Sequence, residues 1–347
     1  MPERRVALVV PGRTSSGGSA FAEQLAPALE ERLGAPIVRH AAPPVGTIDL
    51  SPLRGCSHVV FIGSRAERVP DAKVVFWPLN VAPLERHVVR AESSSLRNRL
   101  RHVALLRRLG RSVAAADGLV FGSFHARTLY QAHYPAGAAL PYAVVPGGTG
   151  SGIERVERRV DPNHPLVLVV SHLYPYKGIR EFVEAVAMAL PRLPEEVGFR
   201  VAGADRDVRY AAAVHARAAE LGLGERLTIA PADPQEMSAL YARATLAVFA
   251  STCENAGSFA LFDGLHAGAP TMCSDRSSMP EMVGDAVRLF NPHQPDLLAD
   301  ALVDLLADPA GLATLTDRAG AWSRQAPVWD GRADQLAIFL DALPEST

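Results

Sequence analysis

The chain has 347 residues, a length that at about 150 residues per domain predicts two domains or one very large one. With 48% hydrophobic and 21% charged residues it holds enough apolar material for full-sized cores, which excludes disordered, collagen-like and coiled-coil chains. Thirty-five basic and 37 acidic side chains leave a net charge of −2, so no global basic field indicates a nucleic acid partner.

The cysteines and the first residues bear on the compartment. Cys56, Cys253 and Cys273 lie in or beside apolar runs and cannot all pair, so we expect buried free thiols in a reducing cytoplasm. The opening MPERRVALVVPGR has only a short apolar stretch before Pro11, which favours a first strand over a signal peptide. No run approaches the length of a membrane span.

Short runs of β-branched and aromatic residues recur along the chain, and a helical pattern follows each. Runs that are apolar on both faces are typical of parallel strands covered by helices, and their alternation with helices predicts a doubly wound α/β sheet. This alternation occurs twice. The expected strands are Val6–Val10, His58–Gly63, Lys73–Trp77, Gly118–Gly122 and Tyr142–Pro146, then Leu166–Ser171, Phe199–Gly203, Arg226–Ala230, Leu246–Ala250 and Pro270–Ser274.

A stretch rich in glycine, proline and charge, Gly147–Pro165, lies between the two halves and is interpreted as a linker. We therefore expect two Rossmann-like domains facing a cleft, formed by residues 1–155 and 156–325. The remaining residues, 326–347, contain an amphipathic helix that can cap either domain. Because ligands of open α/β sheets bind beyond the carboxyl ends of the strands, functional residues are sought in the loops after strands.

One such loop is SHLYPYKG, in which Lys177 directly precedes an expected helix and Gly178 allows close approach of the backbone. A lysine there is a compact positive charge suited to phosphate oxygens, and the free N–H groups of a helix start would assist it. The alternative interpretation is an ordinary surface lysine.

The loop after the expected strand Leu246–Ala250 carries Glu254. Small residues follow, and a helix is expected to begin near Ser258. A carboxylate beside a phosphate-binding helix end indicates a neutral polar ligand such as sugar hydroxyls. Asp263 lies about one turn further along. The alternatives are an ordinary loop residue for Glu254 and a solvated helix position for Asp263.

Two further segments carry weaker signals. Gly17 and Gly18 precede the first expected helix and can admit a phosphate, although a plain turn is the alternative and the pattern is not that of a dinucleotide site. Residues 95–113 form a basic helix, with Leu96, Leu100, Val103 and Leu106 spaced along one face. We expect a solvated helix with one core stripe, and the second interpretation is weak contact with a lipid surface or a polyanionic acceptor.

An ordered series of motifs resembles glycosyltransferase family 4. The segments SHLYPYKG, LGLGERLTIAPADPQEMSALYARATLAVFAST and CEN…FALFDGLHAGAP…MPEMVGDAVRLFNP are similar to its donor-binding half, and the closing WDGRADQLAIFL to its crossover helix. GGSAFAEQLAPALEERLG and ADGLVFGSFHARTLY look like its acceptor domain. The resemblance implies a GT-B fold and retaining, metal-independent transfer of a hexosyl group from a nucleotide diphosphate sugar to a hydroxyl, without a further cofactor.

The resemblance also implies roles for individual residues. Lys177 would hold the donor diphosphate, Glu254 the transferred sugar and Asp263 the ribose. The remaining implied donor-site residues are the helix-start positions Ala256, Gly257 and Ser258, the glycine after the lysine, Gly178, and the loop glycines Gly17 and Gly18.

Several positions depart from the family pattern. His172 stands where an arginine is usual, and would assist the phosphate site as a catalytic group. The acids are spaced E-x8-D rather than E-x7-E. Leu79 and Asn80 stand where the first domain often has a histidine, and Asn80 begins an N-x-x-P pattern on the acceptor side. Asp205 and Asp207 form a D-x-D pattern, but we expect no metal because phosphate-binding loops already supply positive charge.

Two other functions remain open at this point. One is a sugar-nucleotide epimerase, for which no convincing acid–base pair lies near Glu254. The other is a sugar-nucleotide-binding subunit without turnover, suggested by the departures at positions 172, 79 and 263. The acceptor of a transferase would be a carbohydrate, a lipid-linked molecule or a small molecule, and the sequence does not choose among them.

Overall fold

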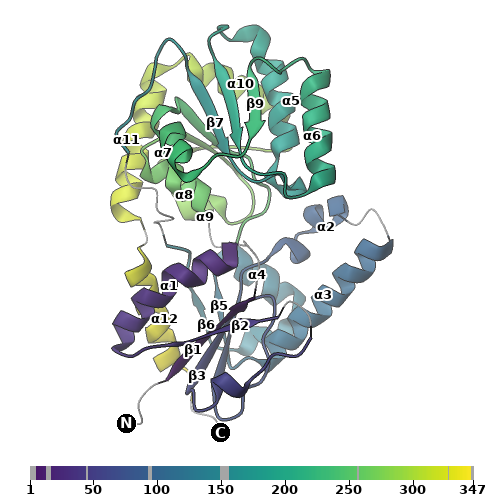
Figure 1. The fold of residues 1–347 in the computed structure, drawn as a ribbon, viewed down its shortest axis with the longest axis vertical. Helices are drawn as coiled ribbons and strands as arrows, with labels where there is room; N and C mark the ends of the chain where they lie inside the picture. The colour runs from purple at the N-terminus through teal and green to yellow at the C-terminus, as the bar shows by residue number, and fades with distance from the viewer. Residues whose placement is uncertain are drawn as a thin grey trace. The chain divides into compact units, whose positions relative to one another are not determined.

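A computed structural model describes residues 5–12, 17–43, 46–92, 96–148, 156–255, 258–326 and 328–344. The contacts divide the chain into two compact units (Figure 1). The N-terminal unit comprises Met1–Gly148, Asn255–Gly257 and Pro327–Thr347, and the C-terminal unit comprises Thr149–Glu254 and Ser258–Ala326.

The N-terminal unit is built on a six-stranded parallel sheet of order β2-β1-β3-β4-β5-β6. Its strands are β1 (Val6–Pro11), β2 (Val38–Ala42), β3 (His58–Gly63), β4 (Lys73–Pro78), β5 (Gly118–Phe121) and β6 (Tyr142–Val144). Its helices are α1 (Gly17–Leu33), α2 (Arg86–Glu92), α3 (Leu96–Ala115), α4 (Phe124–His133) and α12 (Trp329–Asp341).

The C-terminal unit has a second six-stranded parallel sheet, of order β12-β11-β10-β7-β8-β9. Its strands are β7 (Leu166–Val170), β8 (Gly198–Ala202), β9 (Leu227–Ala230), β10 (Leu246–Phe249), β11 (Thr271–Ser274) and β12 (Arg288–Phe290). Its helices are α5 (Ile179–Ala189), α6 (Val208–Glu220), α7 (Pro234–Arg243), α8 (Phe259–His266), α9 (Met279–Val283), α10 (Pro295–Leu306) and α11 (Pro309–Gln325). The strand order reverses between β7 and β10, which is where ligands bind in open α/β sheets.

Both faces of the C-terminal sheet are covered, as the apolar runs predicted. Val167 and Val169 of β7 pack into one core with α5, α6 and α10, whereas Leu168 between them packs on the opposite face with Tyr241 of α7. Phe249 of β10 packs on α8 and α9. Alternate strand residues therefore serve two cores, which gives a three-layer unit.

All ten expected strands are present, and the structure adds two that the sequence pattern did not predict, β2 and β12. Both are edge strands. β2 exposes alternate residues, and β12 is only three residues long. Neither therefore shows the continuous apolar run by which buried parallel strands are recognised.

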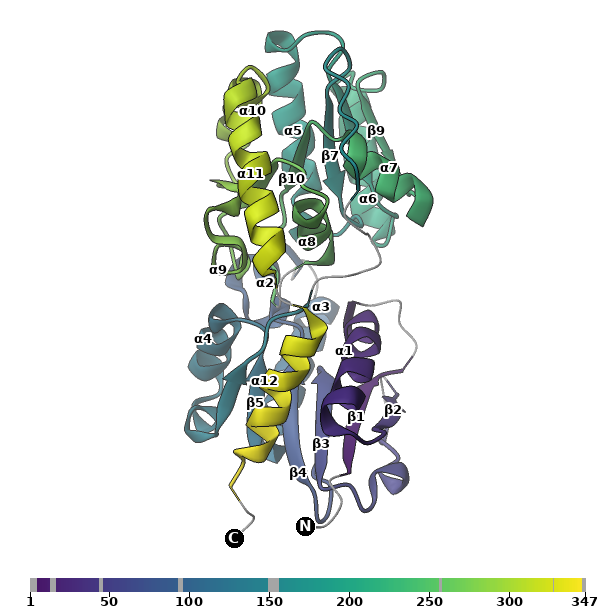
Figure 2. The same cartoon turned by 90° about the vertical axis from the view of Figure 1, so that its left-hand side faces the viewer.

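The C-terminal helix α12 packs on the N-terminal unit, against α1 and β6 (Figure 2). The ring of Phe21 on α1 lies edge-on to both Trp77 of β4 and Trp329 of α12, with centroids 4.9 and 5.0 Å apart. A Cβ at Gly148 would lie 2.7 Å from the Trp329 ring, so the chain just after β6 also fits closely against this helix.

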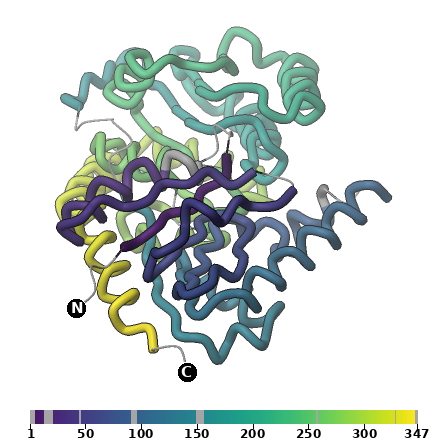
Figure 3. Tube along the Cα trace, turned by 60° about the horizontal axis from the view of Figure 1, so that its bottom comes forward, coloured from purple at the N-terminus to yellow at the C-terminus, as the bar shows by residue number. Residues whose placement is uncertain are grey.

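The structure corrects the expected core stripe of the basic helix. Leu96, Leu100 and Val103 of α3 are 73%, 63% and 43% exposed, whereas Leu109 and Val113 near its end are buried. Figure 1 and Figure 3 show α3 extending away from the sheet of its own unit, so its first turns have no sheet to pack on. Ser95 lies outside the described residues. Among the helices described, none is long and apolar enough to span a membrane.

Candidate functional site

Lys177 and Glu254 meet at the switch point of the C-terminal sheet. Lys177 follows β7 and Glu254 follows β10, and these two strands are hydrogen-bonded neighbours. The Lys177 Nζ donates a hydrogen bond to Oε1 of Glu254, with which it forms an ion pair. Their side chains are 17% and 13% exposed, so the pair is poorly screened by solvent but remains accessible.

Gly178 allows the loop that carries Lys177 to approach the end of β10 closely enough for this ion pair. It follows a 3₁₀ turn, Pro175–Lys177, and adopts a left-handed conformation with φ of +67° before α5 begins at Ile179. A Cβ at Gly178 would lie 2.2 Å from the carbonyl oxygen of Ala250. Only glycine therefore allows the β7 loop to lie this close to the end of β10.

Hydrogen bonds fix the two loops to each other. The backbone N and the Oγ1 of Thr252 donate to the carbonyl oxygen of Tyr176, at 2.7 and 3.1 Å. Ser251 Oγ donates to the same oxygen at 3.3 Å. Lys177 Nζ also lies 5.3 Å from the ring centroid of Tyr176 and 5.9 Å from that of Phe249, within cation–π range.

Two serines that the sequence analysis missed hold the backbone of Glu254. Ser277 Oγ accepts from the Glu254 N–H at 3.1 Å and donates to the Glu254 carbonyl oxygen at 2.6 Å. Ser278 is fully buried, and its Oγ donates to the same oxygen at 2.9 Å. Both lie in SDRSSMP, directly after β11, so their place after a strand was the signal that could have found them.

His172 is oriented as a neutral imidazole. Its Nδ1 accepts a hydrogen bond from the backbone N–H of Ala204 at 3.1 Å, which places the ring proton on Nε2. Partial burial lowers the pKa of His172, and the positive charges of Arg206 and Lys177 lower it further. His172 therefore supplies a hydrogen-bond donor near neutral pH rather than a fixed charge.

Asp263 is not the solvated helix position that was the alternative expectation. It is 6% exposed in α8, and the residues on both sides of it, Phe262 and Gly264, are buried as well. Burial raises the pKa of Tyr241 well above its usual value, and the charge of Asp263 adds to this increase. The role of Asp263 toward a ribose stays a prediction.

Phosphate-binding residues were expected at the starts of two helices, α1 and α8, and the start of α1 differs from this expectation. Gly17 and Gly18 are the first residues of α1 rather than a loop before it. Ser258 precedes α8 and makes no side-chain cap to it. Ala256 and Gly257 lie outside the described residues.

Asn80 is exposed in the loop after β4, and its side chain stabilises the turn that follows. Its Oδ1 accepts from the N–H of Ala82 at 3.0 Å, which starts a 3₁₀ turn, Ala82–Leu84. Its carbonyl oxygen accepts from the Tyr130 hydroxyl at 3.1 Å. Its expected role on the acceptor side stays a prediction.

The D-x-D carboxylates are engaged within the C-terminal unit. Asp207 caps α6 by accepting from the N–H groups of Arg209 and Tyr210, and Asp205 lies 3.3 Å from His215 Nε2. Across the described residues no group of three or more histidine, cysteine, aspartate or glutamate side chains is arranged to hold a metal.

A second polar cluster, also missed, follows strands β4 and β5 of the N-terminal unit. Glu85 has an 11% exposed side chain, and its Oε1 lies 2.5 Å from Nε2 of His125 on α4. Nδ1 of His87 lies 3.6 Å from the other oxygen. Three titratable groups thus gather at the carboxyl side of this sheet, where acceptor contacts were expected.

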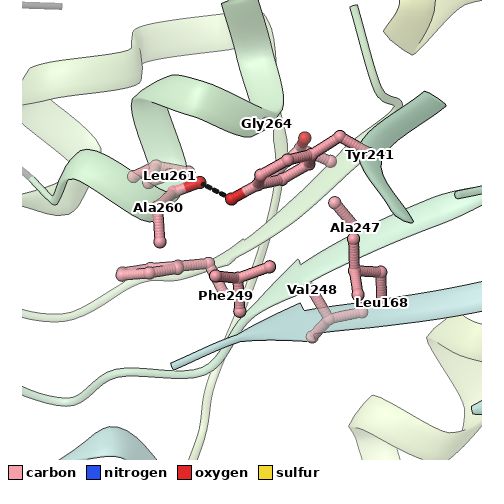
Figure 4. A pocket seen from close by; sticks show the side chains of 10 residues that line it. Leu168, Tyr241, Ala247, Val248, Phe249, Ala260, Leu261 and Gly264 are labelled. Atoms are coloured by element: carbon pink, nitrogen blue, oxygen red, sulfur yellow. Dashed lines mark hydrogen bonds between the residues drawn. The ribbon is translucent and has the colours of Figure 1, made fainter. Parts of the chain in front are cut away.

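A small interior cavity lies between strands β7 and β10 and the helices α7 and α8 that cover them (Figure 4). It is not the candidate site. It encloses about 10 Å³, roughly the lower limit for one water molecule. Its lining is apolar apart from Thr271 and Tyr241, whose hydroxyl donates to the carbonyl oxygen of Ala260 at 2.8 Å. Neither Lys177 nor Glu254 lines it, so we interpret it as a packing gap.

Two Rossmann-like parallel sheets, the second with a lysine and a carboxylate at its switch point, define a GT-B fold. The family model described as "Glycosyl transferases group 1" matches residues 152–326. The chain belongs to this family.

Known proteins of this kind resemble the chain. A GDP-mannose-dependent alpha-(1-6)-phosphatidylinositol monomannoside mannosyltransferase of Mycolicibacterium smegmatis is 26% identical over 261 residues, which span 70% of this chain and 65% of that relative. Sucrose-phosphate synthase from Thermosynechococcus elongatus has a TM-score of 0.75 at 17% identity, covering 98% of this chain and 99% of that structure. Anabaena HepE in complex with UDP and glucose has a TM-score of 0.70 at 16% identity, covering 98% and 100%. The two structures establish the fold.

Proposed function

We propose that the protein is a retaining glycosyltransferase that moves a hexosyl group from a nucleotide diphosphate sugar to an acceptor hydroxyl. The observation that carries the proposal is the ion pair of Lys177 and Glu254 at the switch point between β7 and β10. Membership of the glycosyltransferase family supports it, and so do the donor named for the mycobacterial relative and the UDP and glucose in the HepE complex.

Donor binding would exchange the partners of this ion pair. Phosphate oxygens would take the Lys177 ammonium group, and the Glu254 carboxylate would then accept hydrogen bonds from sugar hydroxyls. Because Ser277 and Ser278 hold the backbone of Glu254, its carboxylate starts from a fixed anchor. Such positioning of a reacting group is one of the main sources of enzymatic rate.

The chemical step breaks the bond between the anomeric carbon and the diphosphate and forms a bond from that carbon to the acceptor oxygen. Negative charge grows on the departing diphosphate, which can take up the proton of the acceptor hydroxyl. Lys177 and the Nε2–H of His172 would stabilise that charge. Losing one preorganised donor of this kind typically lowers the rate about 10²–10³-fold. We propose no metal in this step.

The acceptor side is proposed from α3. This helix holds six arginines and no acidic residue, and its exposed leucines and valine lie beside them. A basic helix with an exposed apolar face is suited to the surface of an anionic bilayer. The mycobacterial relative is named for a lipid acceptor, phosphatidylinositol monomannoside. We therefore propose a lipid-linked acceptor reached at an anionic membrane surface, by a protein whose three buried free thiols favour the cytoplasm.

A panel of nucleotide sugars tests the function. The purified protein is incubated with UDP- and GDP-sugars, with and without candidate acceptors, and nucleoside diphosphate release is measured with and without EDTA. We expect acceptor-dependent release that EDTA leaves unchanged, and a product whose anomeric configuration, read by NMR, matches that of the donor. Donor epimers, or release without transfer, would favour the epimerase. Thermal stabilisation by nucleoside diphosphates without turnover would favour a binding subunit.

A further inference from the structure

The described groups at the end of β7 offer little net positive charge to a diphosphate. Lys177 is paired with the carboxylate of Glu254. His172 contributes no fixed charge, because its Nδ1 accepts the Ala204 N–H. A nucleotide diphosphate carries a negative charge on each phosphate, so even with Lys177 released from Glu254 a second cation at this edge of the sheet would add a charge-assisted hydrogen bond.

Arg206 is held beside these groups by the loop after β8. The N–H of Leu173 donates to the Ala204 carbonyl oxygen at 3.0 Å, and the N–H of Asp207 donates to the Leu173 carbonyl oxygen at 3.1 Å. The Ala204 N–H also donates to His172, so residues before and after Arg206 are both hydrogen-bonded to the β7 loop. The loop therefore holds the backbone of Arg206 against the end of β7.

Close packing of the backbones confirms how near the two loops lie. A Cβ at Gly203, the residue after β8, would lie 1.8 Å from the carbonyl oxygen of Ser171. No other residue fits at position 203 without moving one of the loops. His172 lies on the β7 loop with Lys177 and is hydrogen-bonded to the β8 loop, and the charges of Arg206 and Lys177 both act on it.

The side chain of Arg206 is available for a ligand. It is exposed, and within the described parts of the chain no side-chain hydrogen bond or ion pair engages its guanidinium group. The two neighbouring carboxylates are already occupied, since Asp205 faces His215 and Asp207 caps α6. Arginine also suits the role, because its planar fork can bind two phosphate oxygens at once.

We propose that Arg206 is the second cation of the donor diphosphate site, supplied from the β8 loop in place of a fixed charge at position 172. This inference rests on the proposed function, because the anion is the donor diphosphate. The D-x-D segment then has a role that needs no metal. Its two carboxylates stabilise the loop, and the arginine between them binds the phosphates.

Calorimetric titration of nucleosides with and without phosphates tests the assignment. UDP, UMP and uridine, and the guanosine series, are titrated into wild-type protein, Arg206→Ala and the control Arg209→Ala, which removes an exposed arginine three residues away. We expect Arg206→Ala to weaken diphosphate binding about ten- to a hundredfold, with a smaller loss for monophosphates and none for nucleosides. Arg209→Ala should stay within about twofold, the size expected of a screened surface charge.

A rescue variant separates a direct role from a structural one. In Arg206→Ala/His172→Arg, a guanidinium group returns on the β7 loop, and we expect most of the diphosphate affinity to return with it. Equal binding by Arg206→Ala and Arg209→Ala, or a double variant as weak as Arg206→Ala, would overturn the assignment while leaving the proposed function intact. Wild-type protein that binds neither UDP nor GDP would instead overturn the proposed function, and this assignment with it.

Discussion

Lys177 is one of only two lysines in the chain, the other being Lys73 of the N-terminal sheet. This gives a matched pair of variants. Lys177→Ala removes the ammonium group proposed to stabilise the leaving diphosphate, and we expect turnover to fall at least about tenfold. Lys73→Ala, which removes a hydrogen bond to the Pro344 carbonyl oxygen in the N-terminal unit, should keep normal turnover. Steady-state kinetics decide, and near-normal activity of Lys177→Ala would remove the phosphate role.

Gly178 and Gly222 share the same backbone conformation but differ in their surroundings, with φ of +67° and +69°. A Cβ at Gly222 meets nothing within 4 Å, whereas at Gly178 it collides with Ala250. We expect Gly222→Ala to lose about 1–2 kcal/mol of unfolding free energy from the left-handed conformation alone. Gly178→Ala should lose more, and should also weaken donor binding. Chemical denaturation and titration measure both, and equal losses would contradict the fit of the two loops.

The lowered pKa of His172 has a defined consequence for stability. Folding favours the neutral ring, so its contribution is complete above the unfolded pKa of about 6.5. As the pH falls through 6.5 the unfolded chain binds the proton first, and the contribution is lost. The free energy of unfolding should therefore fall more steeply between pH 7.5 and pH 5.5 in wild-type protein than in His172→Gln. Parallel curves would show that the ring titrates normally.

Among the elements, α3 is the helix for which the sequence pattern predicted the wrong buried residues. Its apolar spacing is that of a core stripe, but the residues that pack are Leu109 and Val113 near its end. Spacing shows which residues share a face, and whether that face meets a sheet depends on where the helix projects. The exposed half is therefore free to serve as the proposed membrane surface.

Vesicle sedimentation tests that surface. We expect the protein to sediment with phosphatidylglycerol-containing vesicles but not with phosphatidylcholine alone, and binding to fall as salt rises. Arg97→Gln/Arg101→Gln should reduce binding about tenfold or more, at about 1 kcal/mol per charge. Arg159→Gln/Arg209→Gln, with the same charge change outside α3, should not. Equal binding of the two double variants, or binding to heparin but to no vesicle, would contradict the proposal.

The chain folds into two compact units, and helix α12 near the end of the chain completes the core of the first. Trp329 of α12 is 8% exposed and packs against Phe21. Trp329→Ala should destabilise the N-terminal unit by about 3–5 kcal/mol, whereas Trp329→Phe keeps an aromatic ring and should lose less. Because the C-terminal core lacks this contact, we expect calorimetry of Trp329→Ala to show one transition moving down and the other unchanged. A uniform shift of a single transition would contradict this independence.

Much of the fold was predictable from local patterns. Runs of apolar residues identified ten strands, the edge strands β6 and β9 among them, whereas half-exposed β2 and the short β12 show no such run. The position of Lys177 between a strand and a helix was also local information. Ser277 and Ser278 carry no distinctive motif, and Arg206 is the variable position of the D-x-D pattern. Their places beside Glu254 and His172 follow only from the loops that pack together in the structure.

The amino-acid order alone determined that two α/β sheets form, and that a lysine and a carboxylate each follow a buried strand. Periodicity and chain direction are properties of neighbouring residues, so they can be read along the chain. That β7 lies beside β10, so that Lys177 reaches Glu254, was decided by tertiary structure, because strand order depends on how helices pack across the sheet. The same packing placed Arg206 beside His172 and left half of α3 without a core to cover.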